Sequence, residues 1–176
     1  MSEWLAAEIY IGGDLYVDEA GGLEELLAGE GFESFGPDGG DQIDDKPEES
    51  YGESLIRASS LGRPWCGYSA EVKGGEFDEI EEFCRKNFLS YKRWTEAKWD
   101  LGGYWEFWGP GRLIRVVNCD SQSKEEVVLV SEVRALTELV SDIAFRRAVD
   151  ALLDANTLPE IPPLRILTGE TRVDRA

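Results

Sequence analysis

The chain has no histidine, only three cysteines and a single methionine among its 176 residues. Without histidine it cannot contain a Ser-His-Asp triad, a Cys-His pair, an imidazole metal ligand or a histidine general base. Cys66, Cys84 and Cys119 are odd in number and widely separated, with no CxxC pair, so the sequence predicts neither a disulfide framework nor a zinc site. We therefore expect no metal and no cofactor.

Long hydrophobic runs are also missing. No run approaches the ~18 apolar residues of a transmembrane helix, and residues 1–7 are not followed by the basic and apolar regions of a signal peptide. We expect a soluble, cytoplasmic protein that makes no membrane contact. Because 42% of the residues are hydrophobic and six are tryptophan, the chain is expected to form one domain with its own core.

Basic residues are scarce in the first third of the chain. Residues 1–53 contain sixteen Asp or Glu and one lysine, Lys46, a net charge of −15, whereas the other 123 residues carry 20 acids and 17 bases, a net charge of −3. The total of −18 and the pI near 4.3 repel phosphate, so we expect no direct binding to nucleic acid or anionic membrane. Basic proteins are the expected partners.

The first half of the chain predicts short elements separated by glycines. Leucines at helical spacing predict a helix from Asp18 to Gly29. Apolar residues at i+3 and i+4 after Phe77 predict a second helix that ends near residues 87–89, with continuation to Lys98 left open. The predicted strands cover residues 4–11, 32–35, 54–59 and 65–72, with a long acidic loop over residues 37–53.

The second half predicts a meander and one long helix. Residues 104–108, 113–119 and 127–130 are expected to form three antiparallel strands. A helix capped by Ser131 is expected to run until shortly before Pro159, and to pack on the sheet through a face that includes Val133. The residues from 166 to 176 predict a flexible tail.

A weak repeat suggests how these elements connect. The order strand, Gly-Gly, acidic helix, aromatic strand and Gly-Pro occurs over residues 7–37 and again over residues 70–110. This order suits two split β-α-β units, as in ferredoxin-like folds. The predicted fold class is α+β, a single domain over residues 1–165 with a mainly antiparallel sheet and two or three packed helices.

The acidic residues of the first third have two interpretations. One is a solvated face that promotes solubility. The other is a surface that imitates the phosphates of nucleic acid, spaced every ~1.7 Å of duplex, and so occupies the basic groove of a nucleic-acid-binding protein. The spread of acids over strand, helix and loop favours the second. The candidate partner-binding acids are Asp14, Asp18, Glu19, Glu24, Glu25, Asp38, Asp41, Asp44, Asp45, Glu48 and Glu49.

A calcium site is not predicted by the same acids. The aspartates from Asp38 to Asp45 lack the alternate spacing, the glycine and the final glutamate of an EF-hand loop. Weak opportunistic cation binding is the most that this pattern indicates.

The aromatic strand carries three further candidate residues. Tyr104, Glu106 and Trp108 alternate along it and therefore share one face. The favoured interpretation is an edge strand whose exposed face offers a protein-binding patch. The alternative is that apolar surroundings raise the pKa of Glu106, which then acts with Asp100 as a general acid and base.

Two arginines and one cysteine complete the candidates. Arg112 and Arg115 predict either a clamp for a carboxylate or phosphate or, more often, ion pairs with glutamates of the same sheet. Cys66, with no histidine to activate it, is interpreted as a buried or unreactive thiol.

In size and charge the chain resembles two groups of small acidic proteins. One is the inhibitors of phages and mobile elements, such as antirestriction and anti-CRISPR proteins, and the other is the immunity proteins that neutralise basic nuclease toxins. The resemblance implies a non-enzymatic module that blocks or shields a basic, nucleic-acid-binding partner. The alternatives are a carboxylate-based, metal-dependent enzyme and a structural or assembly protein whose charge serves solubility.

Overall fold

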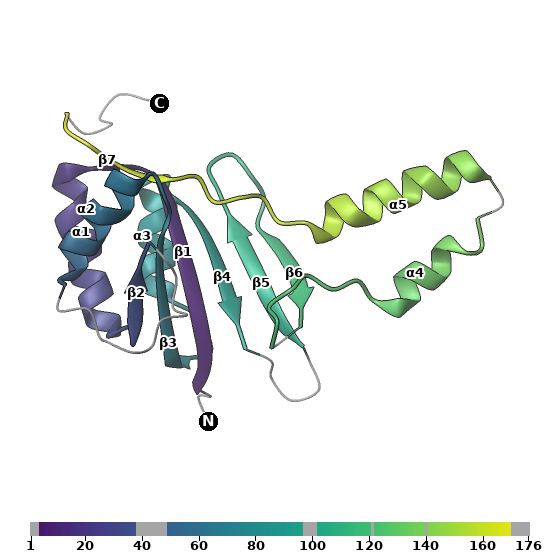
Figure 1. Cartoon of the computed structure of the whole chain (residues 1–176), viewed down its shortest axis with the longest axis horizontal. Helices are drawn as coiled ribbons and strands as arrows, with labels where there is room; N and C mark the ends of the chain where they lie inside the picture. Colours follow the sequence, from purple (N-terminus) through teal and green to yellow (C-terminus); the bar gives the residue numbers. More distant parts are fainter. Residues whose placement is uncertain (1–3, 38–48, 97–101, 121, 140, 170–176) are drawn as a thin grey trace.

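The fold is α+β, with a mainly antiparallel sheet (Figure 1). The computed structural model describes residues 4–37, 49–96, 102–120, 122–139 and 141–169. Within these ranges, seven strands join in the order β2-β3-β1-β4-β5-β6, and β7 pairs with β1. The strands are β1 (Trp4–Tyr16), β2 (Ser34–Gly36), β3 (Trp65–Lys73), β4 (Ser90–Thr95), β5 (Gly103–Trp108), β6 (Arg115–Cys119) and β7 (Leu164–Leu167). The helices are α1 (Val17–Glu30), α2 (Tyr51–Leu61), α3 (Asp78–Lys86), α4 (Val130–Leu136) and α5 (Asp142–Asn156).

Two helical connections interleave in this sheet. β1 and β2 are both antiparallel to β3, which lies between them, and β3 and β4 are both antiparallel to β1. α1 therefore connects β1 to β2, which run in the same direction. α3 likewise follows β3 and precedes β4, which also run in the same direction. The name ferredoxin-like stays a prediction, because α2 is inserted before β3 and the strands β5 and β6 extend the sheet beyond β4.

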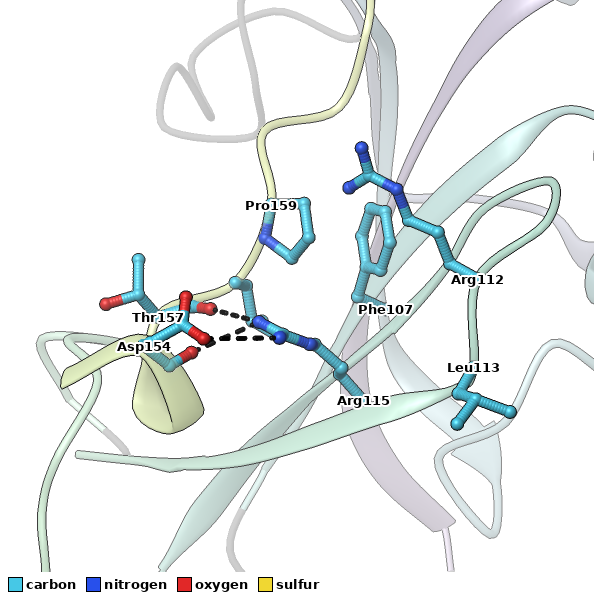
Figure 2. A pocket seen from close by; sticks show the side chains of 8 residues that line it. Phe107, Arg112, Leu113, Arg115, Asp154, Thr157 and Pro159 are labelled. Atoms are coloured by element: carbon cyan, nitrogen blue, oxygen red, sulfur yellow. Dashed lines mark hydrogen bonds and ion pairs between the residues drawn. The ribbon is translucent and has the colours of Figure 1, made fainter. Parts of the chain in front are cut away.

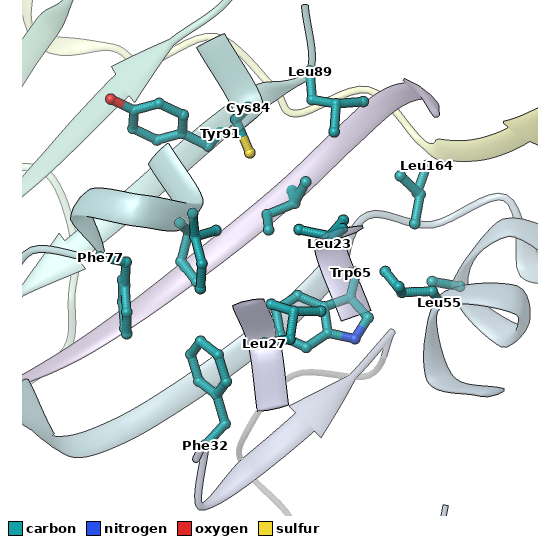
Figure 3. Close-up of a cluster of buried hydrophobic side chains, with 14 of the residues drawn as sticks. Leu23, Leu27, Phe32, Leu55, Trp65, Phe77, Cys84, Leu89, Tyr91 and Leu164 are labelled. Atoms are coloured by element: carbon teal, nitrogen blue, oxygen red, sulfur yellow. The ribbon is translucent and has the colours of Figure 1, made fainter. Parts of the chain in front are cut away.

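The main core lies between the sheet and α1, α2 and α3, which cover the same face (Figures 1 and 3). Alternate residues of β1, including Ile9 and Ile11, are fully buried against Leu23 and Leu27 of α1. Burying each such side chain stabilises the fold by about 1.5–3 kcal/mol relative to leaving it exposed. A second cluster lies on the opposite face, formed by Trp94, Trp105, Phe107, Val117, Cys119 and Leu158.

The first strand is longer than the sequence predicts. Gly12-Gly13 was expected to end it, but Gly13 adopts a φ of 116° and the strand continues to Tyr16. The N–H of Gly13 donates to the carbonyl of Pro163, and residues 13–16 then pair in parallel with β7. The prediction of a flexible tail from residue 166 is therefore wrong at residues 166 and 167. Residues 170–176 lie outside the described ranges.

The segment predicted as a strand at residues 54–59 is a helix, α2. Ser50 caps it by accepting a hydrogen bond from the N–H of Glu53, and the Glu53 carboxylate accepts from the N–H of Ser50. Leu55 and Ala58 are buried three residues apart, which is a helical spacing. The predicted loop over residues 37–53 therefore ends earlier, because residues 51–53 are helical, and residues 38–48 lie outside the described ranges.

The single long helix predicted after Ser131 is instead two helices, α4 and α5. The chain leaves the sheet after one bridge between Cys119 and Glu126, so the strand predicted at residues 127–130 does not form. Leu129, not Ser131, is the N-cap of α4. The two helices, here called the arm, project beyond β6 and do not cover the sheet (Figure 1). The expected packing of the Val133 helix on the sheet is wrong.

The other predicted elements are confirmed within a few residues. These are the helix after Asp18, the helix after Phe77 with its early end, the strands near residues 65–72, 104–108 and 113–119, and the helix end before Pro159. In the described part of the chain, no helix has the length and apolar character needed to cross a membrane.

Candidate functional site

The strongest concentration of charge lies on the helices that cover the sheet. α1 carries five acids and no base over 14 residues, and it contacts α3, whose first turn adds Asp78, Glu79 and Glu81. Helix N-termini stabilise such acids, which explains those at the start of each helix but not Glu25 or Glu30. The exposed acids of α1 and α3 form what is here called the acidic helix layer: Asp18, Glu25, Glu30, Asp78, Glu79 and Glu82.

Carboxylates from the two helices come close enough to repel one another. Partial burial raises the pKa of Glu30, and the charges of Glu79 and Asp78 raise it further. Like charges held together in this way do not stabilise the fold. The layer is therefore a surface whose charge density needs an explanation other than stability.

Four of the predicted partner-binding acids instead bind groups of the same chain. Asp14 forms an ion pair with Arg165 at 2.6 Å, and Glu49 forms one with Arg57 at 2.8 Å. The other two act on backbone: Glu19 accepts from the N–H of Tyr16 at the start of α1, and Glu24 accepts from the N–H of Gly52 and so ties α1 to α2.

The remaining predicted acids divide into two groups. Asp18 and Glu25 are exposed on α1 and belong to the acidic helix layer. The acids of the predicted loop, Asp38, Asp41, Asp44, Asp45 and Glu48, lie outside the described residues. The acidic helix layer also includes acids of α3 that were not among the predicted site residues, although their i, i+3 and i+4 spacing is visible in the sequence.

The aromatic strand is not an edge strand, which corrects the prediction for Glu106. β5 lies between β4 and β6. The Glu106 carboxylate accepts from Arg93 Nη2 at 3.2 Å and from the Tyr91 hydroxyl at 3.1 Å. Arg93 is 1% exposed, and its Nε donates to Glu81 of α3 at 2.6 Å. Glu106 is thus one acceptor of a buried cation that joins β4, β5 and α3.

The two aromatic neighbours of Glu106 are held by the same network. The Tyr104 ring lies 5.6 Å from the Arg93 guanidinium carbon, and Trp108 stacks on Tyr91 with ring centroids 6.2 Å apart. Both are half-buried, so this face of β5 offers a partner less surface than predicted. Asp100, the second group of the alternative acid-base pair, lies outside the described residues.

A second buried ionic cluster, which the sequence did not predict, lies on the opposite face of the sheet. Glu8 is 4% exposed; it pairs with Lys124 and accepts hydrogen bonds from the hydroxyl of Tyr10 at 2.7 Å and the thiol of Cys66 at 3.3 Å. Burial raises the pKa of Tyr10 and of Cys66, so the thiol stays protonated. The signal was a glutamate inside the apolar run of β1.

Lysines and tryptophans complete this cluster. Lys92 Nζ lies 4.2 Å from the ring centroid of Trp105, and Lys124 Nζ lies 4.6 Å from that of Trp94. Burial lowers the pKa of Lys92. Cation–π contacts of this kind stabilise a desolvated ammonium group. Because each described charge here has a partner or a ring, the cluster serves the fold.

A groove lies between the β5–β6 turn and the segment after α5 (Figure 2). Its main cavity is about 570 Å³ and is lined by Phe107, Arg112, Arg115 and Pro159, among others. Arg115 Nη1 donates to the carbonyls of Asp154 and Thr157, both at 3.1 Å, and so caps the end of α5. Arg112 lies over the Phe107 ring, 5.8 Å from its centroid. Arg115 therefore binds the arm and not a glutamate of its own sheet.

Among the described residues, no group of three His, Cys, Asp or Glu side chains is arranged to hold a metal ion. Searches of protein-family models, of curated proteins and of solved structures find no match to this chain.

Proposed function

We propose that this chain is a non-enzymatic, acidic protein-binding module that blocks or shields a basic, nucleic-acid-binding partner in the cytoplasm. The antirestriction, anti-CRISPR and nuclease-immunity proteins are the analogues in size and charge. The observation that supports the proposal is the acidic helix layer, whose six exposed acids lie on the neighbouring helices α1 and α3. Its charge is costly to the fold, and it is most simply explained by a partner of opposite sign.

The layer is rigid, which suits it to imitate a nucleic-acid strand. α1 is fixed to the sheet through the fully buried Leu23 and Leu27. The layer acids of α1, Asp18, Glu25 and Glu30, span about 18 Å of helix axis at a 1.5 Å rise, and the neighbouring α3 adds Asp78, Glu79 and Glu82. A preformed array of this kind steers a basic protein by long-range attraction and lowers the entropy lost on binding.

The two alternatives have less support. The enzyme alternative needs a free carboxylate pair, and Glu106 is committed to Arg93 and Tyr91. The solubility alternative predicts that the position of the charges does not matter. That difference makes position the variable to test.

The test compares two variants with the same net charge. In the helix-layer variant, five acids become amides: Asp18, Glu25, Glu30, Asp78 and Glu79. In the matched control, five exposed acids elsewhere become amides: Glu71, Glu125, Glu138, Asp150 and Glu160. Both substitutions change the net charge from −18 to −13.

Partners captured from host lysate at low salt are identified, and association rates are then measured by surface plasmon resonance across a salt series. The native chain and the control are expected to bind a basic partner with rates that fall steeply with salt. The helix-layer variant is expected to associate at least about tenfold more slowly at low salt, with a flatter salt dependence. Equal effects of the two variants would contradict a specific acidic surface and favour solubility.

A further inference from the structure

The helices of the arm carry apolar side chains that the described part of the fold leaves exposed. Neither α4 nor α5 contains a buried residue. Val133 is 48% exposed, Phe145 43% and Leu153 55%. Helices of seven and fifteen residues gain most of their stability by burying an apolar stripe. The stripe of the arm therefore needs a covering surface.

The arm's own sheet does not supply that surface. At one end of the arm, the N–H of Val127 donates to the carbonyl of Asn118 in β6. At the other end, Arg115 of β6 holds the carbonyls of Asp154 and Thr157. Both attachments lie at the base, and between them the two helices point away from the sheet (Figure 1). Among the described residues, no other element covers the apolar side chains of the arm.

The charge of the arm indicates which molecule. Residues 130–156 carry five acids and three arginines, a net charge of −2, against −15 for residues 1–53. A basic protein is attracted to the acidic helix layer, which lies at the opposite end of the molecule (Figure 1). A second copy can meet the arm while the two acidic layers stay far beyond a Debye length of ~8 Å. Mixed acids and arginines are also self-complementary across a twofold axis.

We propose that the arm is a dimerisation element that pairs with the arm of a second copy about a twofold axis. Phe145, Val149 and Leu152 recur at i, i+4 and i+7 on α5, and Val133 and Leu136 supply the matching stripe of α4. Two such hairpins pack face to face as a four-helix arrangement, which buries both stripes. This inference does not rest on the proposed function.

The test is the mass of the full chain in sedimentation velocity over a range of micromolar concentrations. The native chain is expected to sediment with twice the 19.7 kDa chain mass. The double variant Val133→Glu with Phe145→Glu is expected to dimerise at least about a hundredfold more weakly, because two charges enter an apolar interface. The matched control, Ile56→Glu with Leu61→Glu, alters two residues of α2 that are 62% and 53% exposed, and it is expected to stay dimeric.

A second measurement uses the native chain alone, so its result does not depend on whether a variant folds. Hydrogen exchange of the α5 amides is expected to slow as the protein concentration rises, while exchange in β1 stays constant. A native chain that stays monomeric throughout, a double variant that remains a dimer, or α5 exchange that is independent of concentration would each overturn the proposal.

Discussion

At the scale of single residues, each face of the sheet has an ion pair with a buried member, Arg93 on one face and Glu8 on the other. Arg93 binds Glu81, Glu106 and the carbonyl of Gly75 on the helix-covered face. Lys124 binds Glu8 on the other. Both depend on partners far away in sequence, so sequence patterns did not reveal them. Their common property is that removing one member leaves the other buried without a partner, which costs more than the pair contributes.

Replacement of Arg93 by methionine tests this directly. The change keeps most of the side-chain volume but removes the closer cation of Glu81, which is 4% exposed and retains only the half-exposed Arg85 at 3.6 Å. We expect the free energy of unfolding in urea to fall by about 3–5 kcal/mol. The same replacement at the exposed Arg112 is expected to change it by less than about 0.5 kcal/mol. Equal effects at the two positions would contradict the assigned role.

Two buried tyrosines determine a pH dependence of stability that we expect at alkaline pH. Burial raises the pKa of Tyr10 and Tyr91 above the ordinary 10.0, and nearby acidic groups raise it further. Above about pH 10 the unfolded chain releases the two tyrosine protons and the folded chain keeps them. The stability that these tyrosines contribute is therefore present below that pH and is lost as the pH rises. The lowered pKa of Lys92 acts in the opposite direction below 10.5.

We therefore expect urea midpoints to fall between about pH 9.5 and 11, and to fall less in the double variant Tyr10→Phe with Tyr91→Phe. Superimposable pH profiles for the two proteins would show that other groups control alkaline unfolding.

At the scale of elements, local signals predicted what local physics determines. α1, α3 and β5 carry clear periodicity, and each was placed within a few residues. α2 was predicted as a strand because the apolar pair Leu55-Ile56 favours one. The capping pair Ser50 and Glu53 and the C-cap glycine Gly62 indicate the helix instead. The apolar run at residues 127–130 resembles a strand in sequence, but its pairing with β6 ends at the Cys119–Glu126 bridge and the hydrogen bond from the N–H of Val127 to Asn118, and α4 begins at Val130.

Alanine substitutions at two glycines test the effects of helix propensity and of packing separately. Gly21 lies inside α1 with no atom near a Cβ placed on it, so Gly21→Ala is expected to raise the free energy of unfolding by about 0.5–1 kcal/mol. A Cβ on Gly12 would lie 1.8 Å from the carbonyl oxygen of Pro162, so Gly12→Ala is expected to lower it by about 1–3 kcal/mol. Chemical denaturation measures both, and a neutral Gly12→Ala would mean that the segment before β7 moves freely.

The cap of α2 gives a further prediction. Ser50→Ala removes the acceptor for the N–H of Glu53, and we expect a loss of about 1 kcal/mol in the free energy of unfolding. Ser60→Ala, in the last turn of the same helix, is expected to change it by less than about 0.5 kcal/mol. A loss of similar size at both serines would contradict a capping role for Ser50.

At the scale of the whole molecule, the charge distribution was predictable and the shape was not. The excess of acids in the first third is visible in the sequence, and half of its described acids lie on α1. The groove and the projecting arm depend on how β6, α5 and the segment after it meet. No local pattern encodes that arrangement, so the sequence indicated neither.

Mutual repulsion of these charges predicts a salt effect on stability. Added salt is expected to raise the thermal midpoint of the native chain, because it screens repulsion between carboxylates. The helix-layer variant with five amides is expected to have a higher midpoint at low salt and a smaller rise. If the matched five-amide control shows the same midpoint and the same salt dependence as the helix-layer variant, the repulsion does not lie in the acidic helix layer.

The pairing of β1 with β7 has a consequence for biosynthesis. Gly13 pairs with Leu164, and the carbonyl of Pro163 accepts from the N–H of Gly13. A chain made from its N-terminus at ~5–20 residues per second presents β1 many seconds before β7 leaves the ribosome. During that interval residues 13–16 of β1 lack their partner strand β7, and the closure of this long loop comes last in folding. The nascent protein is thus most open to chaperones and to wrong pairing at its first strand, and the arm is already complete before that strand finds its final partner.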